Sequence, residues 1–297
     1  MIQSTNRRSF LVATTALLFS AGCASGVAKN PRASSAQDQF GKIEKDLGGR
    51  LGVFALNTAT GAQLGHRADE RFAFCSTFKV FAASGVLSKS LQVPGLMQQR
   101  ITYQQSDLVT YSPITQKHVG EGMILADICA AALQYSDNTA GNILIKTLGG
   151  PASVTAFARS IGNTDFRLDR WETALNTAIP DDPRDTCTPR SMGLSLDRLM
   201  LGDAMTPETR AQLQTWMLGN TTGAARIKAG LPADWKIADK TGSGDYGAAN
   251  DLAVVWPSQG EPVIVSIYTT QSQQDAKARS DVIAAATRVV VEWLGTV

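Results

Sequence analysis

The first regular hydrophobic pattern of the chain lies at 40–47, where apolar residues recur at helical spacing and two glycines follow at once. A glycine just after the last periodic residue is typical of a helix end. The next stretch, 50–57, reads RLGVFALN and predicts a strand. A polar turn at 58–61 leads to 63–66, where we expect the return strand to begin.

A second set of β-branched and apolar runs lies near the end of the chain. The segments 235–240, 251–256 and 263–269 predict three strands, because Gly, Ser and Pro turns separate them. The segment 275–294 predicts a long helix. Its apolar positions are Val282, Ile283, Ala286, Val289, Val290 and Trp293.

The middle of the chain, from residue 78 to about 219, is rich in Ala, Leu and Met at a period of 3.6, which indicates helices. Strands at both ends must come together if they are to form one sheet. We therefore predict an α+β fold, an α/β sandwich in which an antiparallel sheet is flanked by the terminal helices. The α/β lobe would comprise about 39–66 and 216–297. An all-helical lobe would comprise about 67–215, with the active site in the groove between the two lobes.

The N-terminus reads as an export signal. Residues 1–28 combine a positive start, a short apolar stretch and small residues, which predicts a signal peptide and not a spanning helix. The pair Arg7 and Arg8 resembles a twin-arginine signal, although a general secretory signal can also carry two arginines. The small residues before Cys23 resemble a lipoprotein cleavage box, so lipid anchoring in the outer membrane and simple cleavage near residue 28 both stay open. We expect 29–38 to be a linker.

The charge balance argues against a nucleic-acid partner. The chain has 28 Lys and Arg against 26 Asp and Glu, and removing two signal arginines leaves 26 bases against 26 acids. A neutral mature chain lacks the basic field that binds phosphates. Only 2 His occur, and they lie far apart, so we expect no metal and no other cofactor. An exported chain of this kind points to the bacterial periplasm.

The spacing of Ser76 and Lys79 is the first candidate for chemistry. They form the only Ser-x-x-Lys of the chain and stand where an apolar helix is expected to begin, so both side chains share one helix face. A serine needs a nearby base to become nucleophilic, and a lysine can serve if burial lowers its pKa. A helix cap followed by a solvated lysine explains this pair equally well when it is taken alone.

Two further short motifs strengthen the catalytic interpretation. Ser136, Asp137 and Asn138 begin a helix predicted for 138–148, and a Lys-Thr-Gly motif at 240–242 stands on a predicted strand. Helix capping explains the first motif by itself, and an edge-strand lysine explains the second. Ser-x-x-Lys, Ser-Asp-Asn and Lys-Thr-Gly in this order and spacing are specific as a set.

In these motifs the sequence resembles the class A serine β-lactamases, from about residue 40 to the C-terminus. The segment from Arg167 to Asn176, which reads RLDRWETALN, resembles the omega loop of that family and contains Glu172. Thr173 is a departure, because many members have proline at that position. The resemblance implies that 39–297 is the catalytic domain of an enzyme that hydrolyses β-lactams.

The resemblance also implies the catalytic roles. Ser76 attacks the lactam carbonyl and becomes acylated, and Lys79 and Glu172 share the proton transfers. Glu172 is the base that activates water for deacylation. Ser136 passes a proton to the departing lactam nitrogen, and Lys240 supports that hydroxyl.

The resemblance gives further residues a part in substrate binding. Backbone N–H groups of Ser76 and Ser243 would form the oxyanion hole. Either Arg226 or Arg279 would bind the substrate carboxylate, with Arg226 favoured. The other implied binding residues are Asn138 for the side-chain amide, Asn176 for the deacylating water, Tyr111 at the entrance, and Thr241 and Gly242 on the strand.

A structural ion pair and the state of the cysteines follow from the same comparison. Arg170 and Asp185 would pin the two ends of the omega loop together. Disulfides that tie the positions of Cys75 and Cys129 in some relatives have no partner cysteine here, so we expect both to be small buried hydrophobes.

Two other functions share part of the motif set. A D-alanyl-D-alanine peptidase of the penicillin-binding group would keep Ser76, Lys79, Ser136, Asn138 and the Lys-Thr-Gly motif, and a β-lactam sensor would stay acylated. Glu172 with Asn176 argues against both, because a deacylating base has little purpose in a sensor and the resemblance does not lead us to expect it in the peptidase. We expect a monomer whose partner is a small-molecule β-lactam.

Overall fold

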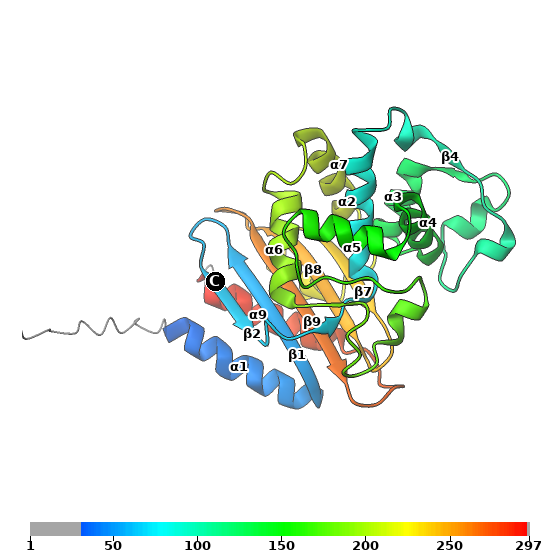
Figure 1. Cartoon of the computed structure of the whole chain (residues 1–297). Helices are drawn as coiled ribbons and strands as arrows, with labels where there is room; N and C mark the ends of the chain where they lie inside the picture. Colours follow the sequence, from blue (N-terminus) through cyan, green and yellow to red (C-terminus); the bar gives the residue numbers. More distant parts are fainter. Residues whose placement is uncertain (1–30, 296–297) are drawn as a thin grey trace, which may run out of the picture.

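The computed structural model describes residues 31–295. Its centre is a five-stranded antiparallel sheet with the strand order β2-β1-β9-β8-β7 (Figure 1). In chain order, the strands are β1 (Gly49–Asn57), β2 (Gln63–His66), β7 (Lys236–Ser243), β8 (Ala249–Trp256) and β9 (Val263–Gln271). The two ends of the chain thus supply one sheet, and the predicted fold class is confirmed.

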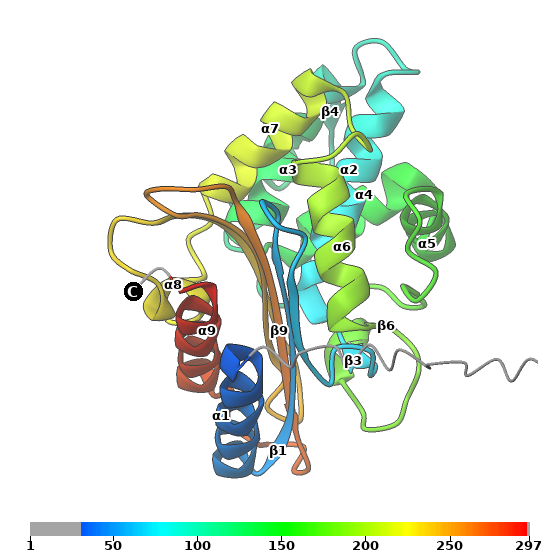
Figure 2. The same cartoon turned by 90° about the vertical axis from the view of Figure 1, so that its left-hand side faces the viewer.

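The terminal helices cover one face of the sheet (Figure 2). They are α1 (Pro31–Leu47) and α9 (Ser280–Leu294), with the short α8 (Ile227–Gly230) beside α9. Leu51, Val53 and Ala55 of β1 point into the core under these helices, whereas Phe54 points into the core on the opposite face. Because both faces are covered, β1 is apolar at successive positions and does not alternate with polar residues.

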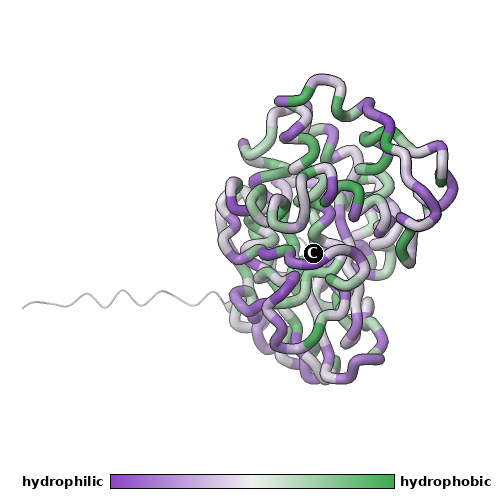
Figure 3. The backbone as a smooth tube through the Cα atoms, turned by 45° about the vertical axis from the view of Figure 1, so that its right-hand side comes forward, coloured by the Kyte–Doolittle hydropathy of each residue, from purple (hydrophilic) through white to green (hydrophobic). Residues whose placement is uncertain are grey.

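The opposite face of the sheet packs against α6 (Pro189–Met200), beyond which the helical lobe begins (Figures 1 and 2). Hydrophobic stretches, green in Figure 3, occur in both parts of the molecule. The remaining helices are α2 (Lys79–Ser90), α3 (Leu125–Gln134), α4 (Asn138–Leu148), α5 (Pro151–Ser160) and α7 (Pro207–Leu218). Short two-stranded pairings join β3 (Phe72–Ala73) to β6 (Thr186–Cys187) and β4 (Arg100–Ile101) to β5 (Met123–Ile124). No helix within residues 31–295 is long and apolar enough to cross a membrane.

Two predicted boundaries need correction. Helix α1 begins at Pro31, so the expected linker at 29–38 is wrong for residues 31–38. Proline suits a first helical position, and Ala36 and Phe40 then bury against the sheet. Helix α9 begins at Ser280 and not at residue 275. The predicted signal peptide lies outside the described residues.

Candidate active site

A pocket of about 370 Å³ opens between the edge strand β7 and the helical lobe. Distant parts of the sequence contribute to its wall. The lining residues are Ser76, Tyr111, Ser136, Asn138, Asn176, Thr222, Arg226, Thr241, Gly242 and Ser243. All of these except Thr222 were candidates from the sequence, so the structure brings the three motifs and the omega-loop segment to one place.

Ser76 lies in a single 3-10 turn, Cys75–Phe78, that leads directly into α2. This turn and the first turn of α2 place Lys79 Nζ 2.9 Å from Ser76 Oγ. Lys79 is fully buried, and burial lowers its pKa, although the neighbouring Glu172 carboxylate opposes that effect. The serine hydroxyl therefore faces an amine that is easier to deprotonate than a solvated lysine.

Four acceptors surround the Lys79 amine. Its Nζ lies 2.9 Å from Glu172 Oε1, 2.8 Å from the carbonyl oxygen of Ser136 and 2.6 Å from Asn138 Oδ1, in addition to Ser76 Oγ. An ammonium has three protons, so it cannot donate to all four at full strength. This arrangement suits a group that shares its protons with Ser76 and Glu172.

Hydrogen bonds fix both the backbone and the side chain of Glu172. Asn142 on α4 accepts from the Glu172 N–H at 2.8 Å and donates to its carbonyl at 3.0 Å. Asn176 Nδ2 donates to Glu172 Oε2 at 2.5 Å, while Oε1 lies 3.4 Å from Ser76 Oγ. The peptide bond between Glu172 and Thr173 is cis. Asn142 is not among the residues predicted from the sequence, although it lies one helical turn after Asn138 on the same helix.

Ser136 and Lys240 meet across the pocket from the two lobes. Lys240 Nζ donates to Ser136 Oγ at 2.9 Å and to the carbonyl of Thr241 at 2.7 Å. Burial and the nearby Lys79 both lower the pKa of Lys240 well below its ordinary value. The buried Asp137 carboxylate caps α4 through Ala140 N–H and also accepts from Thr115, which fixes the loop that carries Ser136.

Asn138 and Tyr111 form the opposite wall. The Asn138 side chain accepts from Lys79 and donates to the carbonyl of Thr110, so its amide orientation is fixed. Tyr111 is 57% exposed and has a left-handed backbone with φ of 64°. An exposed aromatic ring at the rim offers an apolar surface to any molecule that enters.

Arg226 lies in the wall of the pocket and Arg279 does not line it. Arg226 Nη1 donates to the carbonyls of Gly242 and Asn250 at 2.7 and 2.6 Å, and its Nη2 donates to Ser243 Oγ at 2.6 Å. Arg279 instead pairs with Asp46 and Asp281 at 2.9 and 2.8 Å, at the start of α9. The sequence could not separate these two arginines, because the choice depends on tertiary contacts.

The ends of the omega-loop segment are joined by Arg170 and Asp185. Arg170 Nε lies 2.5 Å from Asp185 Oδ2, and the other carboxylate oxygen accepts from the N–H groups of Asp169 and Arg170. Asp185 is fully buried, so all of these donors compensate one desolvated charge.

The cysteines of the described region are reduced and buried. Cys75, Cys129 and Cys187 are free, as expected for the first two. Burial raises the pKa of the Cys75 thiol to about 12, so it is a poor nucleophile despite lying next to Ser76. His66 is also satisfied, by Glu44 at 3.1 Å. Among residues 31–295, no group of three His, Cys, Asp or Glu side chains is placed to hold a metal ion.

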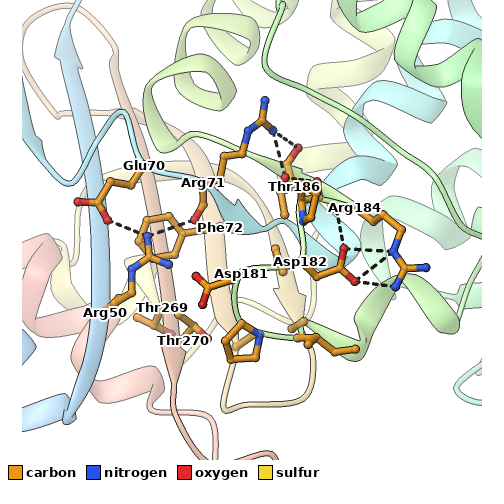
Figure 4. A pocket seen from close by; sticks show the side chains of 16 residues that line it. Arg50, Glu70, Arg71, Phe72, Asp181, Asp182, Arg184, Thr186, Thr269 and Thr270 are labelled. Atoms are coloured by element: carbon orange, nitrogen blue, oxygen red, sulfur yellow. Dashed lines mark hydrogen bonds and ion pairs between the residues drawn. The ribbon is translucent and has the colours of Figure 1, made fainter.

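A second cavity, of about 510 Å³, lies behind the segment 178–186, next to β1, β3 and β9 (Figure 4). None of the residues that line the first pocket lines this one. Arg50 pairs with Glu70 at 2.7 Å, and Arg184 pairs with Asp182 at 2.7 Å. Within each of these two pairs the charges balance. No residue of the three motifs lines this cavity, so we place the candidate active site in the pocket beside Ser76.

Comparisons with known proteins agree with this geometry. The model of the beta-lactamase enzyme family matches residues 35–294. The chain is 53% identical to the beta-lactamase Toho-1 of Escherichia coli, over 98% of this chain and 99% of that protein. It is 52% identical to the beta-lactamase OXY-1 of Klebsiella oxytoca, over 99% and 100% of the two chains. A crystal structure of a beta-lactamase from Desulfarculus baarsii matches with a TM-score of 0.88 at 57% identity, covering 89% of this chain and 99% of that one.

Proposed function

The chain belongs to the beta-lactamase enzyme family as a class A serine β-lactamase that hydrolyses the β-lactam amide bond, and from this premise we propose that Ser76 is its nucleophile. One observation carries the assignment. The Ser76 hydroxyl, the Lys79 amine and the Glu172 carboxylate lie within 2.9 to 3.4 Å of one another in a buried cluster. A serine beside two groups that can take its proton is the arrangement that acyl transfer requires.

Acylation begins when Ser76 Oγ attacks the lactam carbonyl carbon. Its proton passes to Lys79 or to Glu172, both of which contact the hydroxyl, and the two share this role. Backbone N–H groups of Ser76 and Ser243 bind the developing oxyanion, a contribution that is usually the largest in acyl transfer. Ser136 then donates its proton to the lactam nitrogen as the C–N bond breaks and recovers the proton that left Ser76, while Lys240 supports its hydroxyl.

Deacylation needs a base that acts on water. Glu172 takes the proton of a water that attacks the ester carbonyl and returns it to Ser76 Oγ as the ester bond breaks, while Asn176 orients this water and the carboxylate. The placement of Glu172 beside Ser76 supports hydrolysis over the two alternatives, a D-alanyl-D-alanine peptidase and a sensor. The test offers benzylpenicillin and a D-alanyl-D-alanine peptide to the same protein. We expect turnover of the penicillin only, whereas release of D-alanine without penicillin hydrolysis would contradict the proposal.

Asp185→Asn should loosen the segment that carries Glu172. The substitution removes a buried charge that Arg170 and two backbone N–H groups compensate, so we expect the melting temperature to fall by on the order of 5 °C and deacylation to slow. Asp182→Asn is the matched control, since it breaks a more exposed ion pair with Arg184 in the same loop. A parent-like melting temperature and deacylation rate for Asp185→Asn would show that the pair does not position Glu172.

The substrate carboxylate binds at the end of the pocket formed by Lys240, Thr241, Ser243 and Arg226. Asn138 holds the side-chain amide of the substrate, and Gly242 and Tyr111 complete the walls of the pocket. The position of Arg226 in the pocket wall, hydrogen-bonded to Ser243, supports its assignment as the cation for this carboxylate.

Arg226→Ala should lower kcat/KM for penicillins by about 10- to 100-fold, because a charge-assisted hydrogen bond to the carboxylate is lost. The methyl ester of the same penicillin should be affected far less, which separates loss of the carboxylate contact from general damage. Arg279→Ala is the control and should stay near the parent value. Equal losses for acid and ester would contradict the assignment.

We place the mature enzyme in the periplasm as a monomer, exported with residues 1–28 as its signal. Arg7 and Arg8 favour the twin-arginine route, which Lys substitution at both positions should block. The mass of the N-terminal peptide of mature protein distinguishes lipid-modified Cys23 from simple cleavage near residue 28.

A further inference from the structure

Asn250 connects two parts of the active site. It lies on β8 directly opposite Gly242 of β7 and is completely buried. Its side-chain Nδ2 donates to the carbonyl of Ala73 at 2.8 Å, three residues before Ser76. Its own backbone carbonyl accepts from Arg226 Nη1 at 2.6 Å. One residue thus contacts both the segment that leads into Ser76 and the arginine in the pocket wall.

The backbone segment before Ser76 has an unfavourable conformation that contacts with neighbouring residues must stabilise. Cys75 has a φ of 46°, a left-handed conformation that costs energy in a residue other than glycine. The segment also crosses closely over Gly242, where an added Cβ would lie 2.7 Å from the carbonyl oxygen of Phe74 and 3.3 Å from Asn250 Nδ2. The backbone of Phe74 therefore packs directly against the backbone of Gly242. The hydrogen bond from Asn250 Nδ2 to the carbonyl of Ala73 lies beside this contact.

We propose that Asn250 is a positioning residue that sets the spacing between the segment carrying Ser76 and the strand β7 carrying Ser243. These two residues supply the N–H groups of the oxyanion hole, and donors that stabilise an oxyanion must be placed accurately. This inference rests on the proposed function of Ser76. It assigns Asn250 no contact with the substrate, because its side chain points toward Ala73 and does not line the pocket.

Only the Nδ2 group of the Asn250 side chain takes part in the hydrogen bond to Ala73. Its Oδ1 is buried without a hydrogen-bond partner, so the side chain acts here as a donor through Nδ2. Within residues 31–295, the only other side-chain hydrogen bond to the carbonyl of Ala73 comes from the Cys75 thiol, at 4.0 Å. Loss of the amide would leave a partly buried carbonyl with a weak partner at the turn that presents the nucleophile.

Asn250→Ala should lower kcat/KM for benzylpenicillin by about tenfold, because the oxyanion donors are no longer held at the required spacing. The affinity for a boronic acid that bonds to Ser76 and places an oxygen in the oxyanion hole should fall in parallel. Asn163→Ala is the matched control. That amide is also buried, but it bonds to Ser191 and Ser195, away from the pocket, so its loss should lower the melting temperature and leave kcat/KM of the folded enzyme unchanged.

Asn250→Asp gives a readout that a merely structural role would not produce. The ionised side chain can only accept, so it repels the carbonyl of Ala73, whereas the protonated acid can donate an O–H in place of the amide. Burial raises the pKa of such a carboxyl, so the protonated form is gained as pH falls. The ratio of variant to parent kcat/KM should therefore rise from pH 8 to pH 5, whereas the ratio for Asn250→Ala should stay flat.

Parent-like kcat/KM in both Asn250 variants, or a pH-independent ratio for Asn250→Asp, would overturn this inference. Either result leaves the proposed function intact if the parent enzyme still forms and hydrolyses an adduct at Ser76. Absence of that adduct in the parent would instead contradict the proposed function itself.

Discussion

Replacing Glu172 with alanine should leave the enzyme acylated on Ser76. Acylation can still proceed because Lys79 Nζ remains 2.9 Å from the serine hydroxyl, whereas the carboxylate that activates water for the second step is gone. General bases contribute about 10²- to 10⁴-fold, so we expect the deacylation rate to fall within that range. Single-turnover kinetics with benzylpenicillin measure the two steps separately.

Removal of Glu172 also removes the negative charge that raises the pKa of Lys79, so the pKa of the lysine should fall. The lysine is then more readily neutral and can still accept the serine proton. Acylation should slow only through loss of the base role that Glu172 shares with Lys79, as a smaller, second effect. Glu261→Ala, at an exposed position, is the control and should behave like the parent. Parent-like deacylation in Glu172→Ala would require another base and would contradict the assignment.

Replacing Ser76 with alanine should have the largest effect on turnover. The neighbouring Cys75 thiol is a poor substitute, since it is buried with its pKa raised to about 12. We expect kcat to fall by about 10³-fold or more, with no covalent adduct.

The Ser76→Ala variant should fold normally, because within residues 31–295 the lost hydroxyl hydrogen-bonds only with the side chains of Lys79 and Glu172, and these two pair directly at 2.9 Å. Its affinity for benzylpenicillin, measured at equilibrium, should therefore persist. An adduct at Cys75 or residual turnover near the parent rate would show that Ser76 is not the nucleophile.

The sequence predicted the elements and motifs better than the contacts between them. Ser76 and Lys79 share a face by spacing alone, and helix α4 begins at Asn138 as expected. The contact between Ser136 and Lys240 spans 104 positions, so it could be anticipated only from the family motif set. The sequence pattern placed α1 too late, because Pro31 and the alanines and serines after it resemble a linker until the sheet that they cover is known.

The residues missed from the sequence are those that act through other residues. Asn142 holds the backbone of Glu172 from a separate helix, and Thr222 contacts Thr241 at 2.5 Å from a loop. Asn250 acts across two strands. None of these belongs to a motif, because a buried amide or hydroxyl acquires its role only from the tertiary contact that it makes.

The most direct test of the account is the intact mass of the parent enzyme, quenched at intervals after mixing with excess benzylpenicillin. The account predicts a transient adduct of one penicillin per chain, located by peptide mapping on the peptide that contains Ser76. This adduct should disappear as hydrolysed product accumulates and substrate is exhausted. Turnover without any adduct at Ser76, or an adduct that persists for hours without product, would contradict hydrolysis through a Ser76 acyl-enzyme.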